Sequence, residues 1–404
     1  MKYLIESSDV YPIEISSLQW KKTEKNHLLI LKSYYEEICK EKEKIDQLEN
    51  GNEWDRIKKI GNPFELIYTS YHKKKKRDSI SNYQPISRSY FKMWEMLYHF
   101  SDKIFAKERM NIGDAMVFGN LAEGPGGFME AIYNYRTGIH LKHKNCRDVF
   151  YGITLKPHNE YVPDWNKMRK IFGDKPNVHI EYGNLYIHQD IKNYIKSFQK
   201  NKAYIVTADG GFDYSADFNG QEVNSCQIIY SECVVAINIL REKGTFICKV
   251  FDLFTTTMIR ILYLLFMNFE EVYFYKPETS RPANSEKYLI CIGYKNLLNE
   301  EDKAYLLYLI QDFQTGIQKL EENQTFDIFG MRIPGTFFKS IRDYNNLYIQ
   351  QQKYYLQKTI QLAYERPPKE EYEKMIKAQI KNATDWCKKY GVAINYQSSY
   401  LQHH

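Results

Sequence analysis

Two lysines and two carboxylates stand at positions that ordinary packing does not explain: Lys92, Asp209, Lys249 and Glu286. Lys249 lies inside Phe246-Ile-Cys-Lys-Val-Phe251, where its neighbours are apolar and a buried lysine is costly. Desolvation and nearby positive charge would lower the pKa of such a lysine, and an amine with a lowered pKa is a usable general base near neutral pH. An ordinary salt bridge would explain each residue alone. All four at one end of a sheet predict a site that removes a proton.

A glycine turn is the second feature with chemical meaning, in Phe118-Gly-Asn-Leu-Ala-Glu-Gly-Pro-Gly-Gly-Phe128. The apolar run 115–121 predicts a strand, and Phe128 begins a predicted helix. Strand, glycine turn and helix is the arrangement of nucleotide-type cofactor sites, because glycine lets the backbone approach a ligand where a Cβ would clash. We expect Glu123, at the strand end, to accept hydrogen bonds from the cofactor. Alone, such a turn can simply reverse the chain.

The elements that must position these residues alternate from residue 115 onward. Apolar runs rich in β-branched and aromatic residues predict strands at 115–121, 149–155, 178–182, 203–208, 244–251, 271–275 and 287–294. Helices are predicted at 128–136, 190–199, 222–242 and 255–267. This alternation predicts a mostly parallel sheet with helices on both faces.

The last two strands are separated only by the loop 277–286, which is too short for a crossover helix, so they should pair antiparallel. The fold class is therefore α/β, with a Rossmann-like sheet whose last strand is antiparallel. This is the layout of S-adenosylmethionine-dependent methyltransferases. It puts the four polar residues at strand or helix ends, where such folds bind ligands.

Helical extensions are expected on both sides of this domain, giving a division into 1–60, 61–296 and 297–404. The first part contains a possible short strand at 10–15 and an amphipathic helix at 26–48. A further helix is expected to open near Pro85 and reach about Phe105. The C-terminal part predicts helices at 300–324 and 344–363 and a last one that ends near Tyr390. It carries no chemistry motif, which favours a structural or partner-docking role.

Composition sets the broad class. The 404 residues are 43% hydrophobic and 26% charged, which predicts one large folded domain with attachments. The net charge of +6 is uneven, because 73–77 is a basic run that suits phosphate backbones or a solvated loop. The 7 cysteines form no C-x-x-C pair, so we expect a reducing compartment and no structural metal. We find no apolar signal segment or membrane-spanning run, and expect a protein that is neither secreted nor inserted.

Seven segments together resemble a known family: 62–67, 87–92, 121–128, 152–156, 208–212, 246–254 and 276–288. In this order, over roughly residues 60 to 295, they are similar to the FtsJ-like 2′-O-ribose methyltransferases. The closer likeness is to the mRNA cap-specific (nucleoside-2′-O-)-methyltransferases of eukaryotes and large DNA viruses. The resemblance implies that Lys92, Asp209, Lys249 and Glu286 form the Lys-Asp-Lys-Glu tetrad of the family. Lys249 would take the ribose 2′-hydroxyl proton, while the other three set its charge state and orient it.

The resemblance also implies a cofactor, S-adenosyl-L-methionine, and no metal. The cofactor site would be formed by Ser87, Ala122, Glu123, Gly124, Pro125, Gly126, Gly127, Phe128, Asn184 and Leu185. Relatives often carry another small or acidic residue at position 123, and an acidic residue is common at position 184. We therefore expect the ribose and adenine contacts to differ from the family pattern.

RNA contacts are implied for Asn62, Pro63, Asn224 and Asn284. The basic run would hold the transcript's phosphates through Lys73, Lys74, Lys75, Lys76 and Arg77. Nearby aromatics could stack on the cap guanine or the first bases, the candidates being Tyr68, Tyr71 and Tyr83.

The function expected from the resemblance is methylation of the ribose 2′-hydroxyl of the first transcribed nucleotide of capped mRNA, from cap 0 to cap 1. Two alternatives stay open: an enzyme of the same fold for internal ribosomal or transfer RNA, and an inactive RNA-binding scaffold subunit. The expected partners are capped mRNA and, through the C-terminal helices, other capping or transcription proteins. The location would be intracellular: the cytoplasm (viral factory or virion) if the protein is viral, the nucleus if it is cellular.

Overall fold

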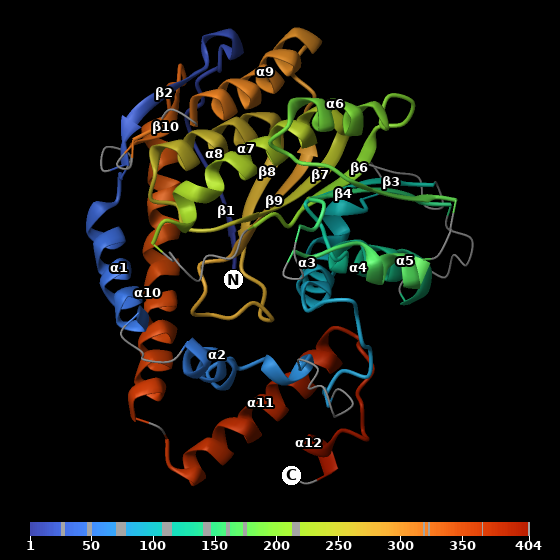
Figure 1. The fold of residues 1–404 in the computed structure, drawn as a ribbon, viewed down its shortest axis with the longest axis vertical. Coiled ribbons are helices and arrows are strands. Elements are labelled where there is room, and N and C mark those ends of the chain that lie inside the picture. The colour runs from blue at the N-terminus through green and yellow to red at the C-terminus, as the bar shows by residue number, and fades with distance from the viewer. Residues whose placement is uncertain are drawn as a thin grey trace.

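An eight-stranded sheet forms the centre of the chain in the computed structural model (Figure 1). The structure describes residues 1–25, 29–46, 51–69, 78–106, 115–139, 147–158, 162–172, 176–211, 219–317, 320–321, 324–365 and 367–402. In spatial order the strands are β1 (Lys2–Leu4), β8 (Phe269–Tyr275), β9 (Lys287–Tyr294), β7 (Leu240–Val250), β6 (Ala203–Ala208), β3 (Val117–Leu121), β4 (Val149–Thr154) and β5 (Val178–Tyr182).

The strand directions confirm the predicted fold class. Strands β7, β6, β3, β4 and β5 pair in parallel, whereas β9 is antiparallel to both β7 and β8. The short β1 adds an antiparallel edge next to β8. The short connection between β8 and β9 accounts for their antiparallel pairing, since a parallel pair needs a longer crossover.

The register aligns the ends of the parallel strands. Leu121 lies opposite Ala208, which lies opposite Cys248, and Thr154 lies opposite Tyr182. The residues that follow these positions therefore emerge at one edge of the sheet. This is the edge at which open α/β folds bind their ligands.

Helices cover both faces of the sheet (Figure 1). One face packs against α3 (Ser89–Ile104), α4 (Gly127–Asn134), α5 (Asn166–Phe172) and α11 (Lys369–Lys389). A π-helical turn, Tyr135–Ile139, ends α4. The other face packs against α6 (His188–Lys196), α7 (Gln221–Ile239), α8 (Thr256–Asn268), α9 (Glu300–Ile317) and α10 (Gly335–Glu365).

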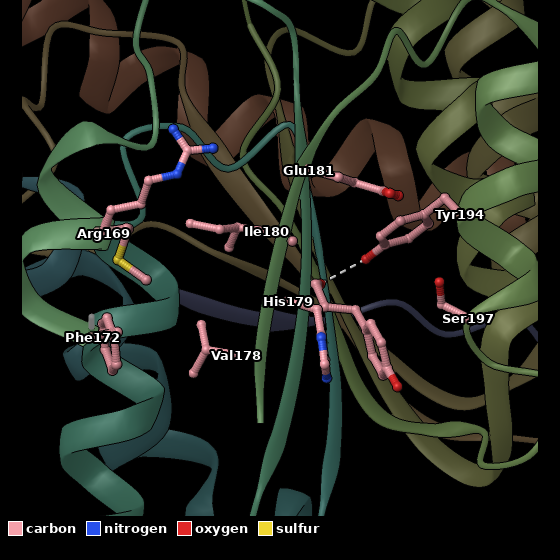
Figure 2. A pocket seen from close by; sticks show the side chains of 11 residues that line it. Arg169, Phe172, Val178, His179, Ile180, Glu181, Tyr194 and Ser197 are labelled. Atoms are coloured by element: carbon pink, nitrogen blue, oxygen red, sulfur yellow. Dashed lines mark hydrogen bonds between the residues drawn. The ribbon is translucent and has the colours of Figure 1, made fainter. Parts of the chain in front are cut away.

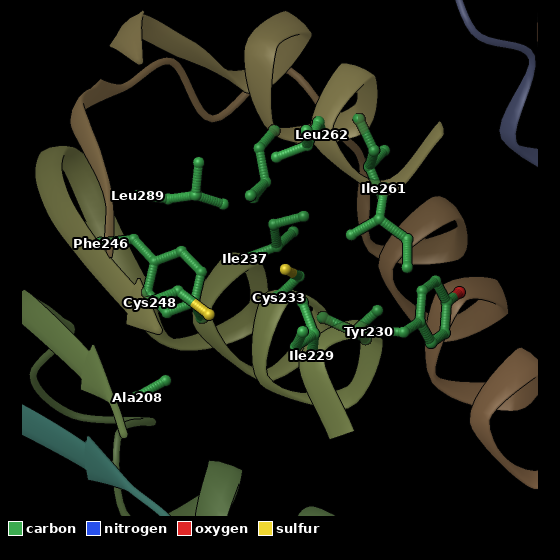
Figure 3. Close-up of a cluster of buried hydrophobic side chains, with 14 of the residues drawn as sticks. Ala208, Ile229, Tyr230, Cys233, Ile237, Phe246, Cys248, Ile261, Leu262 and Leu289 are labelled. Atoms are coloured by element: carbon green, nitrogen blue, oxygen red, sulfur yellow. The ribbon is translucent and has the colours of Figure 1, made fainter. Parts of the chain in front are cut away.

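The period of two along the strands decides which side chains meet which helices. Phe246, Cys248 and Val250 of β7 join the core on the α7 side, and Figure 3 shows Phe246 and Cys248 among α7 and α8 side chains. Ile247 joins the core on the opposite side, with α3 and α4. Lys249 is two residues from Ile247 along the strand, so its side chain points to the same face, the α3 side of the sheet.

The N-terminal part contributes strands as well as helices. The predicted strand at 10–15 is wrong: the only regular element there is a 3-10 turn, Ile15–Ser17, among the described residues. Pro12, which has no N–H for a strand ladder, explains this. Strands form instead at β1 and at β2 (Gln19–Glu24), followed by α1 (Lys32–Asp46), α2 (Gly51–Ile60) and a 3-10 turn, Glu65–Ile67. The amphipathic helix predicted at 26–48 corresponds to α1.

The C-terminal part also departs from the prediction at one point. The helix predicted at 300–324 ends at Ile317, and β10 (Gln324–Phe329) then pairs antiparallel with β2. Helix α10 is longer than expected, and a short α12 (Ser399–Gln402) follows α11. In the part of the chain that the structure describes, no helix is both long and apolar enough to cross a membrane.

Candidate active site

The four residues singled out first lie together as two linked ion pairs. Lys92 Nζ lies 2.6 Å from Glu286 Oε1, and Lys249 Nζ lies 3.2 Å from Asp209 Oδ1. Lys249 Nζ also donates to the backbone carbonyl of Asp209, at 2.7 Å. The hydroxyl of Tyr288 lies 3.3 Å from Asp209 Oδ1 and 3.2 Å from Glu286 Oε1, so it can donate to either carboxylate. Tyr288 thus connects the two pairs.

The fold explains this convergence. Lys249 of β7 lies opposite Tyr288 of β9, and both point to the face that α3 covers. Lys92 is in the first turn of α3, Asp209 follows β6 directly, and Glu286 immediately precedes β9. Segments that are remote in sequence therefore place four charges at one edge of the sheet.

The charge state of Lys249 differs from the expectation. Burial, the largest influence, would lower the pKa of Lys249, but the carboxylates of Asp209, Glu286 and Glu232 raise it above its ordinary value. The expected lowered pKa is therefore wrong, and Lys249 is an ammonium at neutral pH in this structure. Burial would likewise raise the pKa of Glu286, yet Lys92, Lys249 and Lys276 hold it well below the usual range.

A buried carboxyl that sequence reasoning missed lies beside this cluster. Glu232 of α7 accepts a hydrogen bond from Gly210 N–H at 3.1 Å, and burial raises its pKa to about 8. A Cβ at Gly210 would come within 2.2 Å of Glu232 Oε1, so only glycine lets this carboxyl support the turn after Asp209. A glutamate in the mostly apolar run 228–237 of this helix was the available sequence signal.

The glycine turn after β3 has an internal structure of its own. Gly126 has φ 108°, in the left-handed region that favours glycine, and a Cβ there would lie 2.3 Å from Met168 Cγ. The buried carboxyl of Glu123 accepts from Phe128 N–H at 2.8 Å and from Thr207 Oγ1 at 3.1 Å. Burial, assisted by Asp209, raises its pKa well above the usual range. This carboxyl therefore caps helix α4 from within the protein, and the expected contact between Glu123 and a cofactor stays a prediction.

The other residues expected at a cofactor site surround the same edge. Ser87 Oγ lies 2.6 Å from Ser89 Oγ and packs against Gly127, where a Cβ would be only 2.3 Å from it. Asn184, just after β5, donates its N–H to Asp190 and accepts from Tyr186 N–H through Oδ1. The strand ends, the left-handed turn and the partly exposed carboxylate of Asp209 fit a nucleoside-type cofactor that carries positive charge.

The expected RNA contacts fall into three groups. The basic run 73–77 and Tyr71 lie outside the described residues. Asn224 and Asn284 are exposed at the surface, and Pro63 is half-buried.

Two side chains are buried and serve the protein itself. The amide of Asn62 donates to Glu65 Oε2 at 2.7 Å and accepts from Phe64 N–H at 3.3 Å, so this side chain holds the loop together. Contact of the Asn62-Pro63 loop with RNA stays a prediction. Tyr68 is also buried and donates to the carbonyl of Pro85, which makes it a packing residue and corrects the expectation of base stacking.

Helix α3 also anchors the two loops that flank the cluster. Arg88 donates to the carbonyls of Phe64, Tyr68 and Thr279, at 3.0, 3.2 and 3.4 Å. Glu95, fully buried two turns further on, accepts from Thr279 N–H at 2.8 Å and from the N–H of Glu278 at 2.7 Å. The loop between β8 and β9 is thereby held from α3.

A separate hollow of about 580 Å³ opens at the free edge of the sheet, around β5 (Figure 2). Its walls include Arg169 and Phe172 of α5 and Tyr194 of α6, whose hydroxyl donates to the carbonyl of Tyr151. Strands β6, β3 and β4 separate β5 from β7, so this hollow is not part of the ion-paired cluster.

Comparison with known proteins places this geometry in context. A family model described as FtsJ-like methyltransferase matches residues 85–294, just over half of the chain. The chain is 28% identical over 342 residues to cap-specific mRNA (nucleoside-2′-O-)-methyltransferase 1 of Drosophila melanogaster, covering 80% of this chain and 38% of that protein. It is 31% identical over 285 residues to the Bos taurus protein of the same name. That match covers 65% of this chain and 31% of the Bos taurus protein.

The chain thus spans less than two fifths of the length of these curated relatives. Among solved structures, human methyltransferase-like protein 13 overlaps with 55% of this chain and 91% of that chain. The identity is 10% and the TM-score 0.33, so this overlap is too loose to argue from.

Proposed function

The chain belongs to the FtsJ-like methyltransferase family, and from that premise we propose that it methylates the ribose 2′-hydroxyl of the first transcribed nucleotide of capped mRNA, using S-adenosyl-L-methionine. The observation that carries the proposal is the pair of ion pairs, Lys92–Glu286 and Lys249–Asp209, joined through Tyr288. The names of the relatives support the choice of capped mRNA over internal ribosomal or transfer RNA.

The residues that would hold the cofactor are the turn 124–128, Ser87, Asn184 and Leu185, and the carboxylate of Asp209 would offset its positive charge. When bound, the cofactor supplies a methyl group that its sulfonium charge has already activated, so the protein must position the nucleophile and remove one proton. Ser87 and the turn lie against each other, which gives the site a rigid wall.

Lys249 takes the proton of the 2′-hydroxyl in this proposal. It must first lose its own proton, although Asp209, Glu286 and Glu232 stabilise the ammonium. A positive charge bound next to Lys249 opposes these carboxylates and lowers its pKa. Lys92 keeps Glu286 ionised and in place, and Tyr288 keeps the two carboxylates at fixed positions relative to Lys249.

The partners proposed are capped mRNA and, through exposed parts of the C-terminal helices, other capping or transcription proteins. We propose an intracellular location, in the cytoplasm (viral factory or virion) for a viral protein and in the nucleus for a cellular one. Six cysteines of the described residues are buried free thiols, which supports a reducing compartment.

A transfer assay with short RNAs of one sequence tests the proposal. The RNAs end in a 7-methylguanosine cap, an unmethylated guanosine cap or a triphosphate, and the methylated position is read by nuclease digestion and mass spectrometry. We expect transfer to the first nucleotide of capped RNA only, and none with Lys249→Ala, whose cofactor affinity stays close to that of the wild type. Equal transfer to the triphosphate RNA would favour the internal-RNA alternative, and no transfer to any RNA would favour a scaffold.

A further inference from the structure

Helix α10, which lies outside the segment that the family model matches, reaches the loop that carries Glu286. The hydroxyl of Tyr348 donates to the carbonyl of Asn284 at 2.8 Å. One turn further on, Gln352 donates to the carbonyl of Ala283 at 3.4 Å. One turn earlier, Asn345 donates to the carbonyl of Leu253, in the connection between β7 and α8. A single helix thus contacts the loop between β8 and β9 and the connection between β7 and α8.

The Tyr348 contact lies two residues from Glu286. The carbonyl of Asn284 also accepts from Lys276 Nζ at 2.7 Å, and the same amino group donates to the carbonyl of Glu286 at 2.5 Å. The side chain of Asn284 accepts from Glu286 N–H at 3.1 Å. Any displacement of the Asn284 carbonyl is therefore passed on to the backbone of Glu286, whose carboxylate holds Lys92.

The ring of Tyr348 is fixed in place. It is buried, it stacks on Tyr344 with 5.7 Å between ring centroids, and Lys287 Nζ lies 4.3 Å from its centre. The cation over the ring and the stacked neighbour favour one orientation, in which the hydroxyl points at Asn284.

We propose that Tyr348 is a positioning residue of the reaction: its hydroxyl holds the Asn284–Glu286 segment where Glu286 pairs with Lys92 and Asn284 faces the RNA. This inference rests on the proposed function and deepens it, because it gives helix α10 a role in positioning residues of the proposed active site. Tyr348 does not touch the reacting atoms, and acts through Asn284 and Glu286.

The test compares two tyrosines one turn apart. Tyr348→Phe removes only the hydroxyl that bonds Asn284, and Tyr344→Phe removes a buried hydroxyl that has no hydrogen-bond partner among the described residues. We expect Tyr348→Phe to lower kcat/KM for capped RNA about three- to tenfold relative to the wild type. The Kd for the cofactor and the Tm of Tyr348→Phe should match those of Tyr344→Phe. Amide hydrogen exchange at 283–287 should be faster in Tyr348→Phe alone.

The outcomes separate this inference from the proposed function. If wild type is active and the two variants have equal kcat/KM and equal exchange, Tyr348 has no positioning role. If Tyr348→Phe loses cofactor affinity and Tm along with activity, its role is merely structural, and the inference is again overturned. If wild-type protein transfers no methyl group, the proposed function fails, whereas unequal exchange at 283–287 still supports the positioning contact.

Discussion

The charge on Lys249 is the residue-scale question on which the chemistry depends. Asp209 and Glu286, together with Glu232 once it is ionised, raise the pKa of this amine, which is the opposite of what an apolar strand alone would do. A general base must be neutral at the moment of proton transfer, so the proposed role of Lys249 requires an added positive charge that offsets these carboxylates. In the proposed reaction, cofactor binding and base activation are therefore coupled at one atom, Lys249 Nζ.

This coupling predicts two different pH profiles. Below the pKa of Lys249 the neutral fraction falls about tenfold per pH unit, so the rate should rise with pH. We expect the acid limb of kcat, which reports the loaded enzyme, at lower pH than the acid limb of kcat/KM for the cofactor. Initial rates on capped RNA between pH 6 and 9 measure both profiles, and kcat/KM, which reports the raised pKa of Lys249 in the free enzyme, should still be rising at pH 9. Coinciding limbs would show that cofactor binding does not shift the pKa of Lys249.

Glu232 gives a second residue-scale prediction. Its pKa of about 8 in the folded protein lies above the ordinary value of 4.5, so the folded state binds more protons than the unfolded state between these values. Stability contributed by this group is thus lost as pH rises through that window. Glu232→Gln removes this titration and leaves an acceptor for Gly210 N–H. The Tm of the wild type minus the Tm of Glu232→Gln should fall as pH rises from 5.5 to 8. A difference that stays constant over this range would contradict the raised pKa of Glu232.

At the scale of elements, the turn between β3 and α4 requires glycine at position 126. Gly126→Ala would place a Cβ in a left-handed conformation and 2.3 Å from Met168. We expect a loss of about 1–3 kcal/mol in the free energy of unfolding, and weaker cofactor binding. Gly335→Ala is the matched control, because a Cβ at the start of α10 meets nothing within 4 Å. Denaturant unfolding and cofactor titration of both variants check this, and equal stabilities would refute the strain argument.

At the scale of the whole molecule, the C-terminal helices belong to the core of the fold. Trp386 of α11 is buried in the cluster that contains α3, and its indole N–H donates to Glu95 Oε1 at 3.0 Å. Glu95 in turn holds the loop between β8 and β9. Helix α11 therefore supports α3, which carries Lys92. This supports the structural role expected for the C-terminal part, and docking of a partner would come in addition to it.

Removing the Trp386 side chain tests this view. Trp386→Ala should destabilise the protein by about 3–5 kcal/mol, because it leaves a cavity and takes a donor away from the buried Glu95. Tyr396→Ala, at a side chain that is 75% exposed, serves as the control and should change stability little. Urea unfolding monitored by circular dichroism gives both values. A loss below about 1 kcal/mol for Trp386→Ala would mean that α11 is only peripheral.

Much of the fold was predictable, because it rests on local patterns. Alternating apolar runs and amphipathic segments gave the strands and helices of residues 115–294 nearly where the structure has them, since side-chain period reflects which faces are buried. The strand predicted at 10–15 was wrong, because Pro12 interrupts an apolar run, and β1, α2 and α5 were not predicted. Strands β2 and β10 were also missed, and they pair with each other from positions some 300 residues apart in sequence. Strand pairing of that kind leaves no local signal.

The sequence by itself determined the sheet, the turn after β3 and the four residues that converge at its edge, because burial and backbone geometry act over short stretches of chain. Only the tertiary structure decided the protonation of Lys249, the capping role of Glu123, the burial of Asn62 and the reach of Tyr348 to Asn284. These properties depend on distances between charges and hydrogen-bonding groups from remote segments. Electrostatic and hydrogen-bond energies change steeply with such distances, which no pattern in a single sequence records.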